Sequence, residues 1–221
     1  MGKFKNLESK VTENNQIIVN ANGSKYNLLP FFIDSNLLSN EKERVKFIKS
    51  IESIVRNSAV YRAYIKYLKE DIGLKKCMVF GLLDDEKCKI EMHHGPIFTL
   101  YDYVEITLIH FIKTKKNISS FSIAKEILKD HTDNLIQVVM LSEMAHQAAH
   151  AQNKNIRTEF IDIKSAWGDL NGYLLKYQDC LQSKHIIKIN KYLNEYEKKN
   201  KQSSDIFIKN LHLWNKELKL Q

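Results

Sequence analysis

The stretch KIEMHHG, residues 89–95, places two adjacent histidines at the end of a segment that alternates in the manner of a β-strand. Successive side chains of a strand point to opposite faces, so Glu91 and His93 point one way while Met92 and His94 point the other. The whole chain has 8 histidines in 221 residues. Two of them side by side where a strand meets a turn indicate a candidate functional site, although such pairs are often only polar residues at a sheet edge.

The sequence around this stretch predicts a hairpin between helices. Residues 76–94, KCMVFGLLDDEKCKIEMHH, are typical of a strand, an acidic turn at Asp84–Asp85 and a second strand. Helical periodicity precedes them from Ser39 to a glycine stop at Gly73, with a possible break near Asn57–Ser58. Further helices are expected at Leu100–Lys113, Ser120–Lys129 and Val138–Gln152, followed by two or three more between Asp162 and Leu220.

These elements define the expected fold class, which is α+β and mainly helical, with a small β-hairpin plus helix embedded in helical N- and C-terminal flanks. We expect an N-terminal segment and helical region at 1–75, a core at 76–155 with a helical insertion at 97–131, and C-terminal helices at 156–221. Seven glycines and two prolines favour long regular elements over an all-β architecture with many turns.

Composition restricts the class of protein. A hydrophobic content of 43% and a charged content of 27% are ordinary globular values. We expect no membrane association and a cytoplasmic location, because the chain has neither a long apolar run nor a signal-peptide core at its start. Three cysteines without a Cys-x-x-Cys pair agree with a reducing compartment. The net charge of +8 favours a polyanionic partner, nucleic acid first, although a lysine-rich solvated surface has the same charge.

A second histidine pair lies in the predicted helix that contains VVMLSEMAHQAAHAQ. His146 and His150 are four residues apart, so both imidazoles lie on one helix face and can reach a common ion. If this helix packs on the hairpin, His93 supplies a third nitrogen and leaves coordination positions open for phosphate and water. A lone His-x-x-x-His usually binds nothing, and it is the combination with the first pair that favours a metal site.

The order strand–His–His–Gly, Asp–Asn and His-x-x-x-His resembles the HNH nucleases of the ββα-metal (His-Me finger) superfamily, in the three-histidine version of the nuclease colicins. The resemblance covers about residues 76–153. It implies that His93, His146 and His150 are metal ligands, that His94 is the general base, and that Asn134 braces the site and orients the base. It also implies a metal-dependent endonuclease that hydrolyses DNA phosphodiester bonds.

The chain departs from the family pattern in three places. Between His94 and Asn134 lie 39 residues, which exceed the usual loop by two predicted helices. Counting back from His146 by the commoner spacing gives Gln137, so the middle role is open between Asn134 and Gln137. Ser142 and Ala145 stand where one cysteine pair of the family's structural zinc would lie, so we expect no such zinc.

Other residues have weaker predicted roles. Glu91, on the face of His93, is a possible supporting residue for the metal ligands, or a solvated strand glutamate. His131 is a second possible supporting residue, or an exposed histidine at a helix end. Three cations on the tyrosine-rich stretch YRAYIKYLK could contact a DNA backbone, or could belong to an amphipathic helix with half-buried tyrosines. These cations are Arg62, Lys66 and Lys69.

The expected cofactor is one divalent ion, which could be Mg²⁺, Mn²⁺, Zn²⁺ or Ni²⁺. Three imidazoles favour the transition metals over Mg²⁺, which prefers oxygen ligands. The expected partner is nucleic acid, most simply double-stranded DNA, and the small size and composition suggest a phage or mobile element. The alternative is a catalytically silent nucleic-acid-binding or structural protein of the same fold, phage-associated, in which the metal only fixes the hairpin to the helix.

Overall fold

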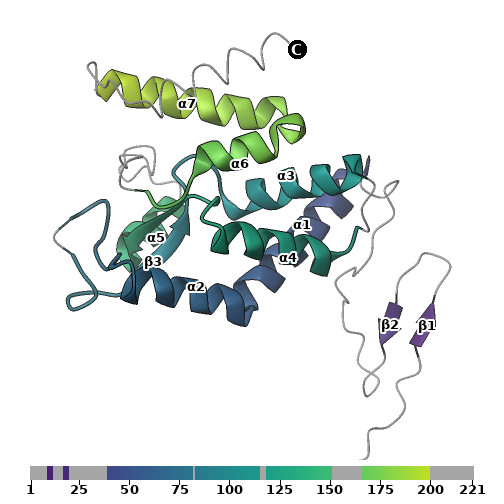
Figure 1. The fold of residues 1–221 in the computed structure, drawn as a ribbon, viewed down its shortest axis with the longest axis horizontal. Coiled ribbons are helices and arrows are strands. Elements are labelled where there is room, and N and C mark those ends of the chain that lie inside the picture. Colours follow the sequence, from purple (N-terminus) through teal and green to yellow (C-terminus); the bar gives the residue numbers. More distant parts are fainter. Residues whose placement is uncertain are drawn as a thin grey trace, which may run out of the picture.

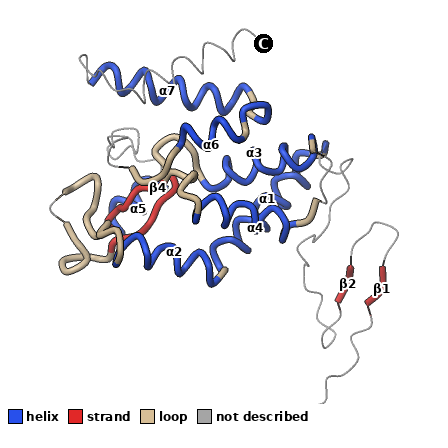
Figure 2. Tube along the Cα trace, in the orientation of Figure 1, coloured by secondary structure: helices blue, strands red, loops and turns tan. Residues whose placement is uncertain are grey.

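A computed structural model describes residues 9–11, 17–19, 39–81, 83–114, 118–150 and 166–199 of the chain. The fold is mainly helical with a small antiparallel sheet, as the sequence predicts (Figures 1 and 2). In the N-terminal region two short strands, β1 (Ser9–Val11) and β2 (Ile17–Val19), pair antiparallel with each other. None of the helices in the described ranges is long and apolar enough to cross a membrane.

Four helices form the main helical layer. α1 (Glu41–Asn57) and α2 (Ala59–Glu70) meet at Ser58, which ends the first helix and caps the second through its hydroxyl, so the predicted break is confirmed. α3 (Leu100–Lys113) and α4 (Ser120–Thr132) each begin with a capping box, which satisfies amide groups that a helix start leaves free. α1 packs against both α3 and α4, whereas α2 packs against α4.

The sheet next to these helices differs from the predicted hairpin. β3 (Ile90–His94) pairs antiparallel with β4 (Val138–Ser142), and the two helices α3 and α4 lie between them in sequence. The expected strand before the acidic turn at Asp84–Asp85 is wrong, because the described residues there form an isolated bridge between Lys76 and Asp84 and one main-chain bond from Met78 to Met140, but no strand. The main chain of β3 thus pairs with a strand more than 40 residues further along the chain. No local turn signal in the sequence identifies that partner strand.

The predicted helix from Val138 to Gln152 also needs correction. Its first part, VVMLS, is the fully buried strand β4, and the helix α5 (Glu143–His150) begins only after it. Short apolar runs read equally well as a buried strand or a buried helix. The result is a strand–strand–helix unit, β3–β4–α5, with the two helices of the insertion placed between its strands, and Gln152 lies outside the described residues.

The C-terminal part packs against α3, and its first described residues contact the start of β4. It contains α6 (Leu170–Lys176), a short 3-10 helix η4 (Gln178–Cys180) and α7 (Ser183–Lys199), and the predicted helical residues beyond Lys199 lie outside the described ranges. Just before α6, Trp167 pairs with the main chain of Val138 at the start of β4. Gly168 has φ +114°, and a Cβ there would lie 2.3 Å from the carbonyl oxygen of Ile136, so this close approach requires glycine.

One hydrophobic core connects the three parts expected from the sequence. It includes Phe47 of α1, Tyr103 of α3, Val139 of β4 and Tyr192 of α7, all almost fully buried. Charged pairs also join α7 to α3, since Lys188 binds both carboxylate oxygens of Asp102 at 2.7 Å. Ile90 of β3, Val139 of β4 and Ala145 of α5 belong to the same core, so the strand–strand–helix unit is part of one packed interior.

Candidate metal centre

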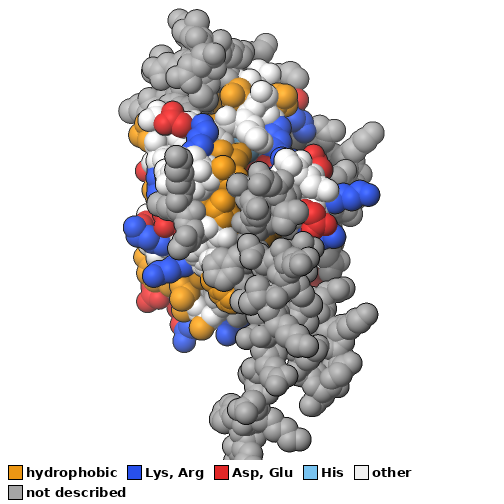
Figure 3. All heavy atoms as spheres, turned by 90° about the vertical axis from the view of Figure 1, so that its right-hand side faces the viewer, with side chains coloured by type: hydrophobic (Ala, Val, Ile, Leu, Met, Phe, Trp, Pro, Cys, Tyr) orange, Lys and Arg blue, Asp and Glu red, His pale blue; other side chains and the backbone are white. Residues whose placement is uncertain are grey.

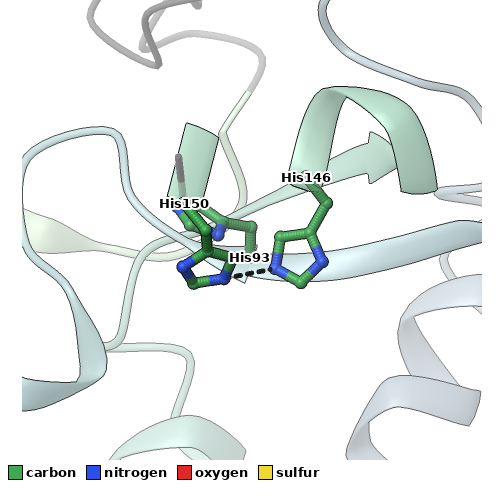
Figure 4. Close-up of side chains that lie close together, drawn as sticks. All are labelled: His93, His146 and His150. Atoms are coloured by element: carbon green, nitrogen blue, oxygen red, sulfur yellow. Dashed lines mark hydrogen bonds between the residues drawn. The ribbon is translucent and has the colours of Figure 1, made fainter. Parts of the chain in front are cut away.

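Three histidines from two elements come together on the outer side of the sheet (Figure 4). Burial alternates along β3, with Glu91 and His93 on the half-buried face and the flanking residues on the core face. His146 and His150 follow one another by one turn along α5, which packs on β3 and β4. The sequence spacing therefore predicts the meeting of His93, His146 and His150, and the structure brings these three rings together.

The distances within this group suit a common ion. One ligand nitrogen from each histidine can be chosen so that all three lie within 4.8 Å of one another. The Nε2 atoms of His146 and His150 are 3.0 Å apart. The centre of the His93 ring lies 5.0 Å from the centre of the His146 ring and 5.2 Å from that of the His150 ring. Two imidazole nitrogens on a tetrahedral zinc, each about 2.05 Å from the ion, would be separated by roughly 3.4 Å. Small side-chain movements would be enough to satisfy that geometry.

Glu91 supports one of the three rings. The Nδ1 of His146 lies 2.5 Å from a carboxylate oxygen of Glu91, so Nδ1–H donates to the carboxylate and Nε2 keeps its lone pair for an ion. Lys89 holds the other carboxylate oxygen. Hydrogen bonds from Lys89 and then His146 keep the pKa of Glu91 below its ordinary value, so this carboxylate is charged. Glu91 thus stands where its predicted supporting role requires it.

The protonation states of the other two rings also suit metal binding. Burial, with the nearby imidazoles of His146 and His150, lowers the pKa of His93 to about 4. Burial is also the main reason why the pKa of His150 is lowered. Only a neutral imidazole has a lone pair to offer a metal, and at neutral pH these two rings need lose no proton before binding. The donor set therefore fits one transition-metal ion.

His94 lies on the opposite side of β3, as the alternation predicts, and is 4% exposed. Its Nε2 is 3.0 Å from the Nε2 of His131, and its ring stacks on that of Tyr61 at 6.1 Å with an interplanar angle of 10°. Burial and the neighbouring His131 hold the pKa of His94 well below its ordinary range. The structure therefore separates the predicted base from the three predicted ligands, and places it among the side chains of α2 and α4.

His131 is fully buried, so the interpretation as an exposed histidine at a helix end is wrong. It lies on the last turn of α4, where its Nδ1 is 2.7 Å from the carbonyl oxygen of Ile127. Its contact is with His94 and not with the three ligands. No sequence signal identifies this contact, because it depends on how the inserted helices return to the sheet.

Asn134 and Gln137 both brace the turn that leads into β4. Asn134 adopts the left-handed conformation, with φ +57°, and its Oδ1 accepts a hydrogen bond from the indole of Trp167 at 3.0 Å. Gln137 is buried, and its carbonyl accepts from the amide of Gly95, directly after His94, at 3.3 Å. Gln137 thus contacts the residue that directly follows the predicted base His94, whereas Asn134 contacts Trp167, which precedes α6.

The three cations proposed for DNA contact are engaged within the chain. Arg62 donates to the carbonyl of Asn57 at 2.8 Å, and Lys69 donates to the carbonyl of Ile90 at 2.6 Å. Lys66 pairs with Glu70 at 3.5 Å on the surface of α2. Two tyrosines of the same stretch, Tyr61 and Tyr64, are buried, so they pack in the core and cannot stack on bases.

The face of the molecule drawn in Figure 3 carries charges of both signs. Lys and Arg side chains alternate there with Asp and Glu, and apolar patches lie between them. On this face the described residues form no continuous basic surface.

Comparison with known proteins identifies the family to which the chain belongs. The model of the bacteriophage G278-like virion protein family matches residues 3–220, almost the whole chain. Comparison with curated proteins and with solved structures gave no match. The expected phage association is thus confirmed, whereas the resemblance to HNH nucleases stays an expectation. Because the match extends from the first residues through the helices after β4–α5, the chain belongs to the bacteriophage G278-like virion protein family.

Proposed function

We propose that this phage protein binds one divalent transition-metal ion through His93, His146 and His150 and hydrolyses DNA phosphodiester bonds there. The observation that carries the proposal is the convergence of these three rings on a strand–strand–helix unit, with a carboxylate holding one of them. Three protein ligands leave at least one coordination position open, as catalytic sites do, whereas structural zinc sites are closed by four.

Each residue of the centre has a distinct task in this proposal. A bound ion supplies Lewis-acid stabilisation of the charge that builds on the phosphate oxygens. His93 and His150 hold the ion, and Glu91 keeps the Nε2 of His146 directed toward it. His94 is the proposed proton acceptor for the attacking water, a task for which a neutral imidazole is suited.

DNA is the proposed substrate because of the positive net charge of the chain and its membership of a phage virion protein family. The net charge of +8 attracts a polyanion, and the family is one of phage virion proteins. A virion protein with this activity would act on phage or host DNA. Since the described cations of α2 are paired within the chain, we place no specific DNA contact on Arg62, Lys66 or Lys69.

One observation favours a second function, in which the ion only pins β3 to α5 and the protein has a structural role in the particle. His94 is buried on the core face of β3 and bonded to His131, whereas a base must reach water. Under this alternative the ion increases stability, and the protein does not cut DNA.

A plasmid-nicking assay separates the two functions. Wild type, His94→Ala and His146→Ala are compared in EDTA, Mg²⁺, Mn²⁺, Ni²⁺ and Zn²⁺. His110→Ala serves as a matched control, because it removes a histidine of α3 whose ring contacts Tyr177. We expect metal-dependent nicking by wild type and the control, loss of nicking with retained metal in His94→Ala, and loss of both in His146→Ala. Metal-loaded wild type that leaves the plasmid intact would refute the nuclease and favour the structural role.

A further inference from the structure

The contact between His94 and His131 is a buried pair of imidazoles outside the metal centre. His131 is the last buried residue of α4, and His94 is the last residue of β3. Their Nε2 atoms are 3.0 Å apart and their rings are nearly perpendicular, at 88°. Two facing ring nitrogens at this distance form a hydrogen bond only if one bears a hydrogen and the other does not.

The second contact of His131 decides which nitrogen bears the hydrogen. Its Nδ1 lies 2.7 Å from the carbonyl oxygen of Ile127, and a carbonyl oxygen can only accept. Nδ1 of His131 therefore bears a hydrogen. Burial lowers the pKa of this ring to about 4, so it is neutral at pH 7 and its Nε2 is a bare acceptor. The hydrogen between the two rings must then belong to the Nε2 of His94.

We propose that His131 is a positioning residue, which fixes the ring of His94 with its hydrogen on Nε2 and leaves Nδ1 as the only nitrogen able to accept a proton. The assignment of the hydrogen follows from the two contacts of His131 together with the neutral state of its buried ring. Its consequence for catalysis, that Nδ1 of His94 is the basic atom, rests on the proposed function.

The surrounding aromatic side chains hold both rings in place. Tyr61 stacks on His94 and meets the edge of His131 at 5.4 Å, and Tyr64 contacts the ring of His131 at the same distance. Tyr103 lies 6.4 Å from His94 on the side of α3. A ring flip of His94 would therefore break the bond to His131 within a packed interior, where an unpaired polar group is unfavourable.

The contact between His94 and His131 also gives the insertion between β3 and β4 a role. In the sequence the two inserted helices only lengthen the loop after His94. In the fold, α4 returns to the sheet and presents His131 to the end of β3. The insertion thus supplies the group that orients the histidine at the strand end.

Long-range ¹H–¹⁵N correlation spectra of ¹⁵N-histidine-labelled full-length protein at pH 7 test this assignment. They show which ring nitrogens bear hydrogen. In wild type we expect hydrogen on Nε2 of His94 and on Nδ1 of His131. Hydrogen on Nδ1 of His94 in wild type would overturn the inference without any variant.

Two substitutions extend the test. His131→Gln keeps an acceptor facing His94, and we expect it to preserve the wild-type tautomer, whereas His131→Phe removes the acceptor and should shift His94 toward the Nδ1–H form. If nicking is observed, we expect a loss of at least about tenfold in kcat for His131→Phe, with metal content unchanged, because a base in the wrong tautomer cannot take the proton. An unchanged tautomer in folded His131→Phe would overturn the positioning role. The expected tautomers in a wild type that does not nick DNA would sustain this inference and refute only the proposed nuclease.

Discussion

Replacing Glu91 by glutamine tests whether the histidine group is a metal site with a supporting carboxylate. The carboxylate accepts the Nδ1–H of His146 at 2.5 Å, and the two side chains are only 23% and 19% exposed. Carboxylates that hold a ligating histidine typically contribute 10- to 100-fold to metal affinity. Since this pair is mostly shielded from water, we expect Glu91→Gln to weaken Zn²⁺ or Ni²⁺ binding by about 30-fold, or ~2 kcal/mol.

The assay is competition with a chromophoric chelator at pH 7.5, using protein first stripped with EDTA. Glu143→Gln is the control, because it removes the same charge from the first turn of α5 while its described hydrogen bond goes to Gln147. The control should bind metal within about twofold of wild type, as expected for loss of an exposed charge. Equal affinities for wild type and Glu91→Gln would show that the Glu91 carboxylate does not support a metal ligand at His146.

Three further predictions follow from the site and its surroundings. Metal at 100 times its Kd should raise the free energy of unfolding of wild type by about 2.7 kcal/mol in urea titrations, reversibly with EDTA, and should leave His146→Ala unchanged. Burial lowers the pKa of His131 to about 4 from about 6.5 in the unfolded chain, so the unfolded chain binds this proton first as the pH falls. The contribution of this histidine to stability is complete above pH 6.5 and is lost toward pH 4. Between pH 7 and pH 5 we expect the free energy of unfolding to fall by about 2 kcal/mol through this group, and we expect His131→Gln to abolish this part of the pH dependence. Asn134→Ala should cost about 2 kcal/mol, and Asn134→Gly about 1 kcal/mol, in the same titrations, because both lose the bond to Trp167 but only alanine is strained at φ +57°.

Local patterns in the sequence predict much of this fold. Capping residues and apolar periodicity place the boundary at Ser58 and the helix Leu100–Lys113 where the structure has them. The spacing of His146 and His150, with the alternation of β3, predicts which rings share a face. These features depend on residues within a turn or two of each other, where geometry is fixed by the chain itself.

The features that sequence does not predict are those set by contacts between distant segments. The partner of β3 is β4, beyond the two inserted helices, and the apolar run VVMLS fits a buried strand and a buried helix equally well. The burial of His131 and its bond to His94 depend on the packing of α4 against the sheet. The alternation of β3 predicts the side on which His94 lies, but not that its ring is enclosed by side chains of α2 and α4.

Calorimetric titration of Zn²⁺ or Ni²⁺ into EDTA-stripped wild type and His146→Ala tests whether His93, His146 and His150 together hold one ion. We expect one ion per wild-type chain and no saturable binding to a folded His146→Ala chain, because two imidazoles remain and the residue held by Glu91 is gone. Equal stoichiometry and affinity in the two proteins would contradict this expectation, since the ion would then be held elsewhere than at His93, His146 and His150.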